Sequence, residues 1–463
     1  METRLFARVI YRLSRKMTDE KLSFDCCDAS RNGIGGTLVQ ALFHSFATKD
    51  YRWLWFITTL TNAGSWTYTL VVTWQAYELT HSSSWSGAIM FATLVPNIVG
   101  APIAGVLADV MDRRRIMFFV AITQVLDTGL LAFLSHFGLT TPMWLLGLSF
   151  VFGFASSALS VMLSSLVPAI VSSDKLFNAL SLQAVAQRGT EFVGPAVASP
   201  LLISFGPGMV YLLASCLYLF ASALVFFLSP IEIHSQELND RTKSIFSPLV
   251  DGFIYIRRTP TIGILVSLVG LHCALTMAYM GILPQFVKIS LHGDGAFYGV
   301  MMSTIGLGSI LGTLLLAGVR NLRIRGSLYW MTALISGISL FGLAISHRHL
   351  MAIPAIALVG ASQAAFMTLS LGYIQQMAAK HMRGRVTSFY LVLAGGFMSL
   401  ANLGYGALSS VIPPTEIMAA TGSLFVLVVI VYGVLSKQFR SVSRTGVFMA
   451  QSEMPVSTTY SVS

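Results

Sequence analysis

Charged residues are scarce in this sequence. Aspartate, glutamate, lysine and arginine together make up 10% of its 463 residues, whereas 55% of the residues are hydrophobic. A soluble domain carries about a quarter charged residues, so this composition excludes an ordinary soluble protein and leaves a lipid bilayer as the surroundings of most of the chain. The net charge of +10 would indicate nucleic acid only if the basic residues formed one patch, and they do not. No nucleic-acid partner is expected.

Cysteine and catalytic motifs are also rare. Cys26, Cys27, Cys216 and Cys273 lack the spacing of a metal site or a disulfide framework, so unpaired thiols and no metal are expected. The ATP-binding pattern G-x-x-x-x-G-K-S/T and the hydrolase patterns H-E-x-x-H and G-x-S-x-G are missing. We therefore expect neither an enzyme nor a cofactor. An intramembrane enzyme that uses the acids Asp127 and Glu191 is the remote alternative.

Apolar runs of about 20 residues are what the sequence has in abundance. Only helices and closed barrels satisfy their backbone polar groups inside lipid, and these runs lack the alternation of barrel strands. Six runs fall within residues 53–228 and six more within 262–435. The sequence predicts an all-α membrane protein with twelve transmembrane helices. The polar stretch before the first run has no apolar core or cleavage site, so it is not expected to be a secretory signal.

The positions of the basic residues predict the orientation in the membrane. All but three of the 29 lysines and arginines fall on one side of the predicted spans; Lys288 and Arg348 fall on the other side and Arg188 lies inside a span. Cytoplasmic loops carry the excess of basic residues. We expect a multi-pass protein of the cytoplasmic (inner) cell membrane, with the lipid bilayer as its partner and both termini in the cytoplasm.

A weak internal repeat predicts two pseudo-symmetric six-helix bundles. At a shift of 207 residues Gly105 aligns with Gly312 and Arg113 with Arg320, although Asp109 aligns with Leu316. Fused helical halves of this kind are common in transporters. The expected parts are a cytoplasmic head (1–52), a first bundle (53–228), a cytoplasmic central loop (229–258), a second bundle (259–436) and a cytoplasmic tail (437–463).

One loop motif carries a family resemblance. Between the second and third spans lie a glycine, two acids and three arginines, namely Gly105, Asp109, Asp112, Arg113, Arg114 and Arg115. This segment resembles the signature G-x-L-A-D-x-x-(G/D)-R-R-R of the major facilitator superfamily. A plain basic loop would explain the arginines but not the glycine four residues before an acid. We interpret the segment as a gating motif, in which the glycine allows close helix approach and the acid forms ion pairs or accepts from a neighbouring helix N-terminus.

Three further segments resemble the subgroup that contains the enterobactin exporter and macrolide efflux proteins. They are Leu166–Pro168 with the following Asp174–Leu176, Gly252–Arg258, and Arg383–Val386. The resemblance covers about residues 50–436 and implies export of small amphipathic molecules, driven by ion exchange. One departure concerns the glycine-rich antiporter motif of span five, because Gly194-Pro195 is followed by Ala198 and Ser199 where that motif has glycines.

Ionisable residues inside predicted spans are proton-coupling candidates, since such groups are costly in lipid. Asp127 lies near the middle of span three, where apolar surroundings favour the neutral acid; a structural hydrogen bond, for example to Gln124, is the other interpretation. Arg188 and Glu191 are three residues apart on span five and can share one face. They form either an internal ion pair or, if that face lines the cavity, a second proton site.

The remaining polar residues of the spans are candidates for the substrate cavity. In the resembled fold spans one, four, seven and ten line that cavity, and the candidates on them are Asn62, Trp66, Ser156, Ser160, His272 and Gln363. The serines recur every four residues, as either a polar stripe or a packing seam. His272 can equally be a satisfied interior histidine. This sparse, serine-lined set with aromatic and methionine residues suits adaptable apolar ligands.

These observations predict a secondary active transporter that works by alternating access. The favoured function is proton-coupled export, by antiport, of a small amphipathic molecule such as a drug or a siderophore. An importer or facilitator of a polar metabolite is the alternative within transport. A non-transporting receptor or assembly factor with the same fold is the alternative outside it, with the head and tail as its binding parts.

Overall fold

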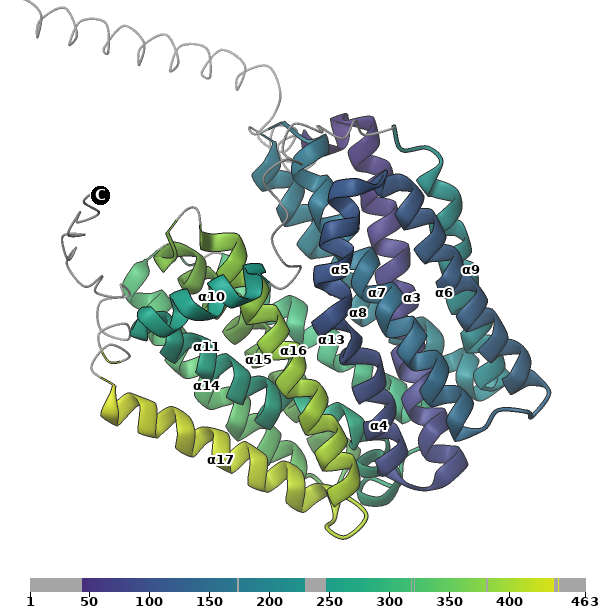
Figure 1. Cartoon of the computed structure of the whole chain (residues 1–463). Coiled ribbons are helices and arrows are strands. Elements are labelled where there is room, and N and C mark those ends of the chain that lie inside the picture. Colours follow the sequence, from purple (N-terminus) through teal and green to yellow (C-terminus); the bar gives the residue numbers. More distant parts are fainter. Residues whose placement is uncertain are drawn as a thin grey trace, which may run out of the picture.

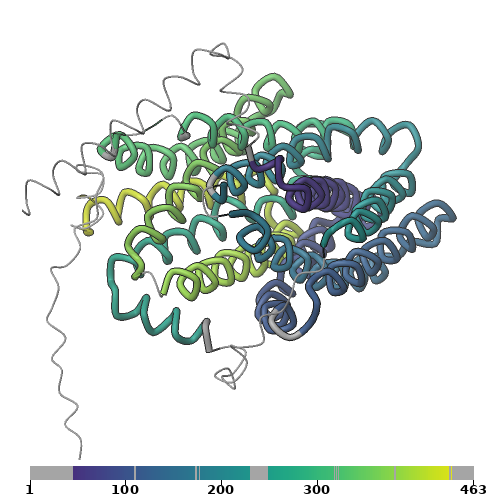
Figure 2. The backbone as a smooth tube through the Cα atoms, turned by 90° about the horizontal axis from the view of Figure 1, so that it is seen from above, coloured from purple at the N-terminus to yellow at the C-terminus, as the bar shows by residue number. Residues whose placement is uncertain are grey.

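The chain folds into two groups of helices. A computed structural model describes residues 44–172, 175–229, 247–317, 319, 321–379, 382–436 and 440, and every regular element in that part is a helix. Helices from the first half of the chain form one group and helices from the second half form the other (Figure 1). Seen from above, the purple and blue helices lie to one side and the green and yellow helices to the other (Figure 2). The predicted all-α membrane fold of two bundles is confirmed.

The first bundle supplies six membrane crossings. Its elements are η1 (His44–Ala47), α3 (Lys49–Thr80), α4 (Ser83–Leu94), α5 (Pro96–Val110), α6 (Arg113–His136), α7 (Pro142–Ile170), α8 (Leu176–Phe205) and α9 (Pro207–Val225). The helices α4 and α5 follow each other directly and form one crossing. Pro96 separates them because proline has no N–H for the helical ladder and its ring clashes with the preceding turn.

The second bundle begins after a short connecting helix and contains one irregular crossing. Its elements are α10 (Ser247–Arg258), α11 (Pro260–His272), η3 (Cys273–Met277), η4 (Ala278–Gly281), α12 (Leu283–Gln285), η5 (Phe286–Ser290), α13 (Gly295–Ala317), α14 (Leu322–Ala344), α15 (His349–Met377), α16 (Arg383–Leu408) and α17 (Pro414–Leu435). The seventh crossing runs from α11 to η5 and changes between α, π and 3-10 geometry. Such changes inside a helix often mark functional sites or hinges.

Local sequence signals explain where several helices begin. The Asp112 carboxylate accepts a hydrogen bond of 3.0 Å from the Arg114 backbone N–H at the start of α6. The hydroxyl of Thr141 caps α7, whose first residue is Pro142, and the side chain of Asn321 caps α14. Side-chain caps satisfy backbone N–H groups that have no partner within the helix, and proline suits the first turn because it has none to satisfy.

Ten helical segments in the described part are long and apolar enough to cross a membrane. The other two of the twelve expected crossings are α3 and α8, with 32 and 30 residues. At 1.5 Å per residue both exceed the hydrocarbon thickness of about 30 Å. Their composition is more polar because α3 carries charged residues near its ends and α8 carries Arg188 and Glu191.

The two bundles make close contacts at one end of the molecule. There the hydroxyls of Thr73 and Tyr298 lie 2.8 Å apart, and the Ser84 hydroxyl donates to the Gly406 carbonyl oxygen at 3.0 Å. A Cβ on Gly87 would lie 2.4 Å from the carbonyl oxygen of Asn402, so the backbones of α4 and α16 are in direct contact. Toward the other end, where α10 and the arginine clusters lie, α5 and α16 diverge (Figure 1). The bundles are therefore in close contact at the end poor in basic residues, and their helices α5 and α16 separate toward the arginine-rich end.

The connecting helix α10 packs across the arginine-rich end of the second bundle. Asp251 forms a salt bridge of 3.1 Å with Arg385 at the start of α16, and the Tyr255 hydroxyl accepts a hydrogen bond from the Ala379 backbone N–H. A Cβ on Gly252 would meet the Arg385 carbonyl oxygen at 2.6 Å, so glycine is required for this close approach. The central connection is thus partly helical and docked rather than a plain loop.

Candidate functional site

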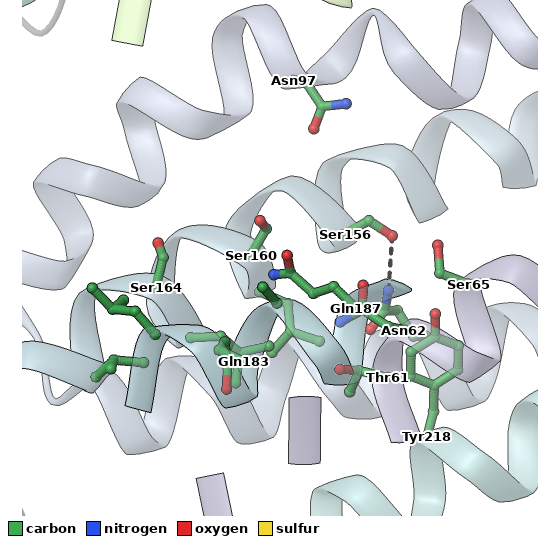
Figure 3. A pocket seen from close by; sticks show the side chains of 16 residues that line it. Thr61, Asn62, Ser65, Asn97, Ser156, Ser160, Ser164, Gln183, Gln187 and Tyr218 are labelled. Atoms are coloured by element: carbon green, nitrogen blue, oxygen red, sulfur yellow. Dashed lines mark hydrogen bonds between the residues drawn. The ribbon is translucent and has the colours of Figure 1, made fainter. Parts of the chain in front are cut away.

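A cavity of about 420 Å³ lies inside the first bundle. It is bordered by α3, α5, α6, α7, α8 and α9, and Figure 3 shows the serines of α7 in a row facing the amides of neighbouring helices. The polar lining residues are Thr61, Asn62, Ser65, Asn97, Gln124, Ser156, Ser160, Ser164, Gln183, Gln187 and Tyr218. The cavity is therefore rich in hydrogen-bonding groups although it lies within an apolar bundle.

The cavity lining is polar but uncharged. Its amides both donate and accept hydrogen bonds and its hydroxyls do the same. Two amides are already oriented: Gln124 donates to the Ser156 hydroxyl at 2.9 Å and Gln183 donates to the Thr58 hydroxyl at 2.6 Å. The expected serines and one aromatic residue, Tyr218, are present, but the polar lining is not sparse and contains no methionine. Such a lining suits a ligand with several neutral polar groups.

The serine row on α7 was open to two interpretations, and the structure distinguishes them. Ser156, Ser160 and Ser164 line the cavity, so they form a polar stripe. The adjacent Ser157 is buried and faces Gly100 of α5, where an added Cβ would meet its hydroxyl at 3.1 Å. The packing seam therefore exists, but a different serine occupies it.

The other cavity candidates divide between the two bundles. Asn62 lines the cavity. Trp66 packs against α8 instead, with its Cβ 3.0 Å from the position of a Cβ on Gly194. His272 is fully buried in the second bundle, with Nε2 3.0 Å from the Ser336 hydroxyl and its ring against Phe366.

Gln363 is also buried in the second bundle. It donates to the backbone carbonyl of Thr276 at 2.5 Å, and Thr276 lies in the π-helical turn η3. Gln363 therefore holds the irregular seventh crossing in place. The expected cavity position is wrong for His272 and Gln363 in this conformation, because both side chains are buried within the second bundle. Nε2 of His272 and the amide nitrogen of Gln363 are hydrogen-bonded, whereas Nδ1 of His272 has no partner among the described residues.

Asp127 lies in the interior of α6, one turn beyond the cavity residue Gln124. Its side chain is buried, and neither carboxylate oxygen has a hydrogen-bond partner among the described residues. The proposed bond to Gln124 is absent there, since Gln124 donates to Ser156. A buried carboxyl without partners is more easily accommodated as the neutral acid than as the anion.

Arg188 and Glu191 form the expected ion pair on α8. The guanidinium Nη1 is 3.1 Å from the Glu191 carboxylate, whose side chain is buried while that of Arg188 is 37% exposed. Ser309 of α13 donates to the other oxygen of Glu191 at 3.4 Å. The pair is therefore not confined to the first bundle, because it reaches the seam between α8 and α13.

The arginines of the gating motif bind helix ends within the first bundle. Arg113 donates to the carbonyl oxygens of Ala108 and Ser165, and Arg114 donates to those of Val225 and Phe226. Cations are favourable at helix C-termini, where carbonyl groups lack partners. These two arginines thus connect the ends of α5, α7 and α9.

The other residues of the gating motif differ in what they contact. Arg115 is exposed and lies 3.8 Å from Asp112. Nothing lies within 4 Å of a Cβ placed on Gly105, so the close helix approach expected there is wrong for this conformation. The side chain of Asp109 lies outside the described part of the chain.

Sequence reasoning missed several lining residues, notably Asn97, Gln183 and Gln187. The two glutamines are four residues apart on α8, a spacing that places both on one helix face. This spacing could have predicted that one face of α8 is polar and lines the cavity. Asn97 stands alone in an apolar stretch, so nothing in the sequence marks the direction in which it points.

Comparison with known proteins supplies the context of this site. Residues 40–452 match a major facilitator family described as transmembrane secretion effector. The chain is similar to the staphyloferrin A transporter of Staphylococcus aureus, with 22% identity over 73% of this chain and 84% of that protein. It is also similar to the enterobactin exporter EntS of Shigella boydii, with 25% identity over 75% of this chain and 82% of that protein.

Solved transporter structures share the fold. The nucleoside transporter NupG superposes with a TM-score of 0.67 at 14% identity, over 84% of this chain and 99% of that one. The peptide transporter POT superposes with a TM-score of 0.69 at 12% identity, over 85% of this chain and 95% of that one. At these identities the likeness concerns the arrangement of the helices alone.

Proposed function

The chain belongs to the transmembrane secretion effector family of major facilitator transporters, and from this premise we propose that it exports a small polar molecule by proton-coupled alternating access. It is a multi-pass membrane transporter related to siderophore transporters. The direction of transport, the coupling ion and the substrate class are what we propose beyond this family membership. The direction and the ion are those predicted from the sequence, whereas the predicted amphipathic cargo is replaced by a polar one.

The observation that carries the proposal is the polar cavity in a molecule closed at one end. The bundles meet through the Thr73–Tyr298 and Ser84–Gly406 hydrogen bonds, while α5 and α16 diverge toward the arginine-rich end (Figure 1). Rocking of one bundle against the other around a central site is how transporters of this architecture alternate access. We assign the arginine-rich end to the cytoplasm, together with both termini and the boundaries of head, bundles and tail predicted above, because basic residues mark cytoplasmic loops.

The substrate class follows from the cavity lining and from the relatives. Eleven of the sixteen residues that line the cavity are polar and none is charged, which favours a ligand with many hydroxyl, amide or carbonyl groups. The names of the two relatives refer to the siderophores staphyloferrin A and enterobactin. A siderophore or a similarly polar secreted metabolite is accordingly our proposed cargo.

Proton coupling is assigned to Asp127. The support is its burial in α6 without a hydrogen-bond partner among the described residues, one turn from the cavity residue Gln124. An ionisable group at bilayer depth is a functional hypothesis by default. Glu191 is the second candidate, and it is already paired with Arg188 at 3.1 Å.

The test uses inside-out membrane vesicles with enterobactin and staphyloferrin A as probes. An imposed gradient with an acidic lumen should drive accumulation of a probe into the lumen, and a protonophore should abolish it. Vesicles without the chain are the control. Accumulation that ignores the proton gradient would refute proton coupling but not export.

Import of a polar metabolite is the second candidate function. The amides of Asn62, Asn97, Gln124, Gln183 and Gln187 favour it, since polar metabolites are held by such groups. Right-side-out vesicles distinguish the two directions. Gradient-driven uptake into these vesicles, with none into inverted ones, would favour import over export.

A further inference from the structure

Arg188 is the one lysine or arginine in the interior of a described membrane-crossing helix. It is the thirteenth residue of α8, whereas the other basic residues of the described spans lie near helix ends. A guanidinium group stays ionised at any physiological pH. A permanent charge at this depth is expensive and is usually retained for a function.

The pair with Glu191 fixes Arg188 at the boundary between the bundles. Glu191 accepts a hydrogen bond from Ser309 of α13. A Cβ on Gly306 would lie 2.6 Å from the Glu191 carbonyl oxygen, so α8 and α13 touch at this position. Arg188 lies one turn before this contact and is bound to Glu191 at 3.1 Å. Its guanidinium therefore lies beside the seam between the two bundles.

The guanidinium group has unused binding capacity. It carries five N–H donors, and Glu191 is its one hydrogen-bond partner among the described residues, through Nη1. The side chain is 37% exposed, so these donors are accessible. Gln187 precedes Arg188 on α8 and lines the uncharged polar cavity, so the backbone of Arg188 lies at the border of that cavity although its side chain is not part of the lining.

We propose that Arg188 is an anion subsite at the edge of the transport cavity and takes a carboxylate group of the cargo. The planar fork of arginine donors matches a carboxylate in bidentate geometry. In the ligand-free protein Glu191 holds this subsite as an internal competitor. The cargo is thus a small acid whose neutral polar part occupies the cavity beside Gln187. The inference rests on the proposed transport function for the identity of the ligand as cargo.

A purely structural ion pair and a competitor for the anion subsite predict opposite effects of Glu191→Gln on anion binding. If the pair is structural, Glu191→Gln leaves a charge without its partner and lowers stability, with no gain in anion binding. If Glu191 competes for Arg188, the same change frees the guanidinium and strengthens anion binding. The direction of the effect therefore separates the two roles.

The experiment measures equilibrium binding of two matched probes to the full chain in lipid nanodiscs. Salicylate and its uncharged amide, salicylamide, have nearly the same shape and differ by one charge. By titration calorimetry we expect the wild type to bind salicylate about tenfold more tightly than salicylamide, since a charge-assisted hydrogen bond contributes about this factor. Arg188→Gln should abolish the preference, Arg188→Lys should reduce it, and Glu191→Gln should tighten salicylate binding several-fold.

Controls keep the result interpretable. Arg348→Gln, at an exposed position before α15, should retain the wild-type preference. Thermal melting shows whether Arg188→Gln is folded, and Arg188→Lys supplies the answer if it is not. Equal binding of both probes by the wild type, no binding of salicylate, an unchanged preference in both Arg188 variants, or weaker salicylate binding in Glu191→Gln would each overturn the subsite.

The binding test is independent of the transport test because no gradient is applied. Loss of vesicle transport with an intact salicylate preference would count against export and leave the subsite in place. Transport of a neutral probe together with no salicylate preference would support transport and overturn the subsite.

Discussion

Lys288 and Glu78 form a salt bridge of 3.3 Å that joins the second bundle to the first at the closed end. Lys288 lies in η5 and Glu78 in the last turn of α3. The Lys288 ammonium group also lies 5.8 Å from the centre of the Trp74 ring. Because these residues come from different bundles, the contact must break whenever the closed end opens.

Glu78→Gln should shift the population toward molecules that are open at this end. Both side chains are more than 40% exposed, so the pair is worth at most about 1 kcal/mol, or about a fivefold change in population. Spin labels at Leu139 and Val411, in a background without native cysteines, would report the distance between the bundles. The exchanged pair Glu78→Lys with Lys288→Glu should restore the wild-type distribution, and an unchanged distribution in Glu78→Gln would contradict this role.

The repeat-related glycines Gly105 and Gly312 should respond differently to alanine. A Cβ on Gly312 would lie 2.2 Å from the Ala361 carbonyl oxygen, whereas one on Gly105 meets nothing within 4 Å. Overpacking of a close contact costs about 1–3 kcal/mol, so Gly312→Ala should lower the melting temperature by several degrees while Gly105→Ala leaves it unchanged.

The gating interpretation adds a second expectation for Gly105. If α5 packs closely when the arginine-rich end closes, a bulky side chain at this position blocks that state. Gly105→Leu should insert and melt like the wild type yet lose most of its transport turnover in vesicles. Normal turnover would remove Gly105 from the gate.

The orientation makes a topological prediction. Alkaline phosphatase is active only outside the cytoplasm, so fusions after Thr80 or His136 should be active and fusions after Arg115, Arg258 or Arg385 inactive. A green fluorescent protein series at the same positions should give the inverse pattern. A single reversed loop would contradict the twelve-span topology.

Two glutamines show how far sequence alone predicts this site. Gln187 is exposed to the cavity, whereas Gln363 is buried and bonded to Thr276. Gln187→Ala should weaken substrate binding about tenfold without loss of stability, because a hydrogen bond to a ligand is removed. Gln363→Ala should lower the melting temperature instead. Substrate titrations and melting curves of the two variants check this contrast. A lower melting temperature in Gln187→Ala, with weaker substrate binding in a stable Gln363→Ala, would contradict it.

The difference between these glutamines explains what the sequence could and could not predict. The apolar runs predicted the crossings because every backbone group in lipid must be bonded within a helix. A single polar residue in such a run carries no signal for direction, since a cavity and an interior hydrogen bond satisfy it equally well. The prediction from polar residues in the spans was therefore correct for Asn62 and Ser156 and wrong for His272 and Gln363. It did not include Asn97, which lines the cavity.

The last prediction concerns the coupling of transport to protons. If protons drive export, at least one acid inside the membrane must take up and release a proton as the two bundles rock. Within the described spans, Asp127 and Glu191 are the buried acids. Glu191 has Arg188 at 3.1 Å and Ser309 at 3.4 Å, so both of its carboxylate oxygens already have partners. Asp127 has no hydrogen-bond partner among the described residues, so no neighbouring group there holds its carboxyl in one state.

Asp127→Asn should therefore abolish uphill, gradient-driven export, because the amide imitates the protonated acid and cannot exchange the proton. Downhill exchange of labelled for unlabelled substrate should persist, since the neutral form already supports the movement of the bundles with cargo bound. Both rates are measured in the same inside-out vesicles, with and without an acidic lumen, and Thr128→Ser, a buried neighbour on α6 outside the cavity lining, is the matched control for local packing. Uphill export retained in Asp127→Asn would transfer the role to Glu191 or to another coupling ion. Loss of both rates, with the control active, would show that Asp127 acts on the conformational change itself rather than on coupling alone.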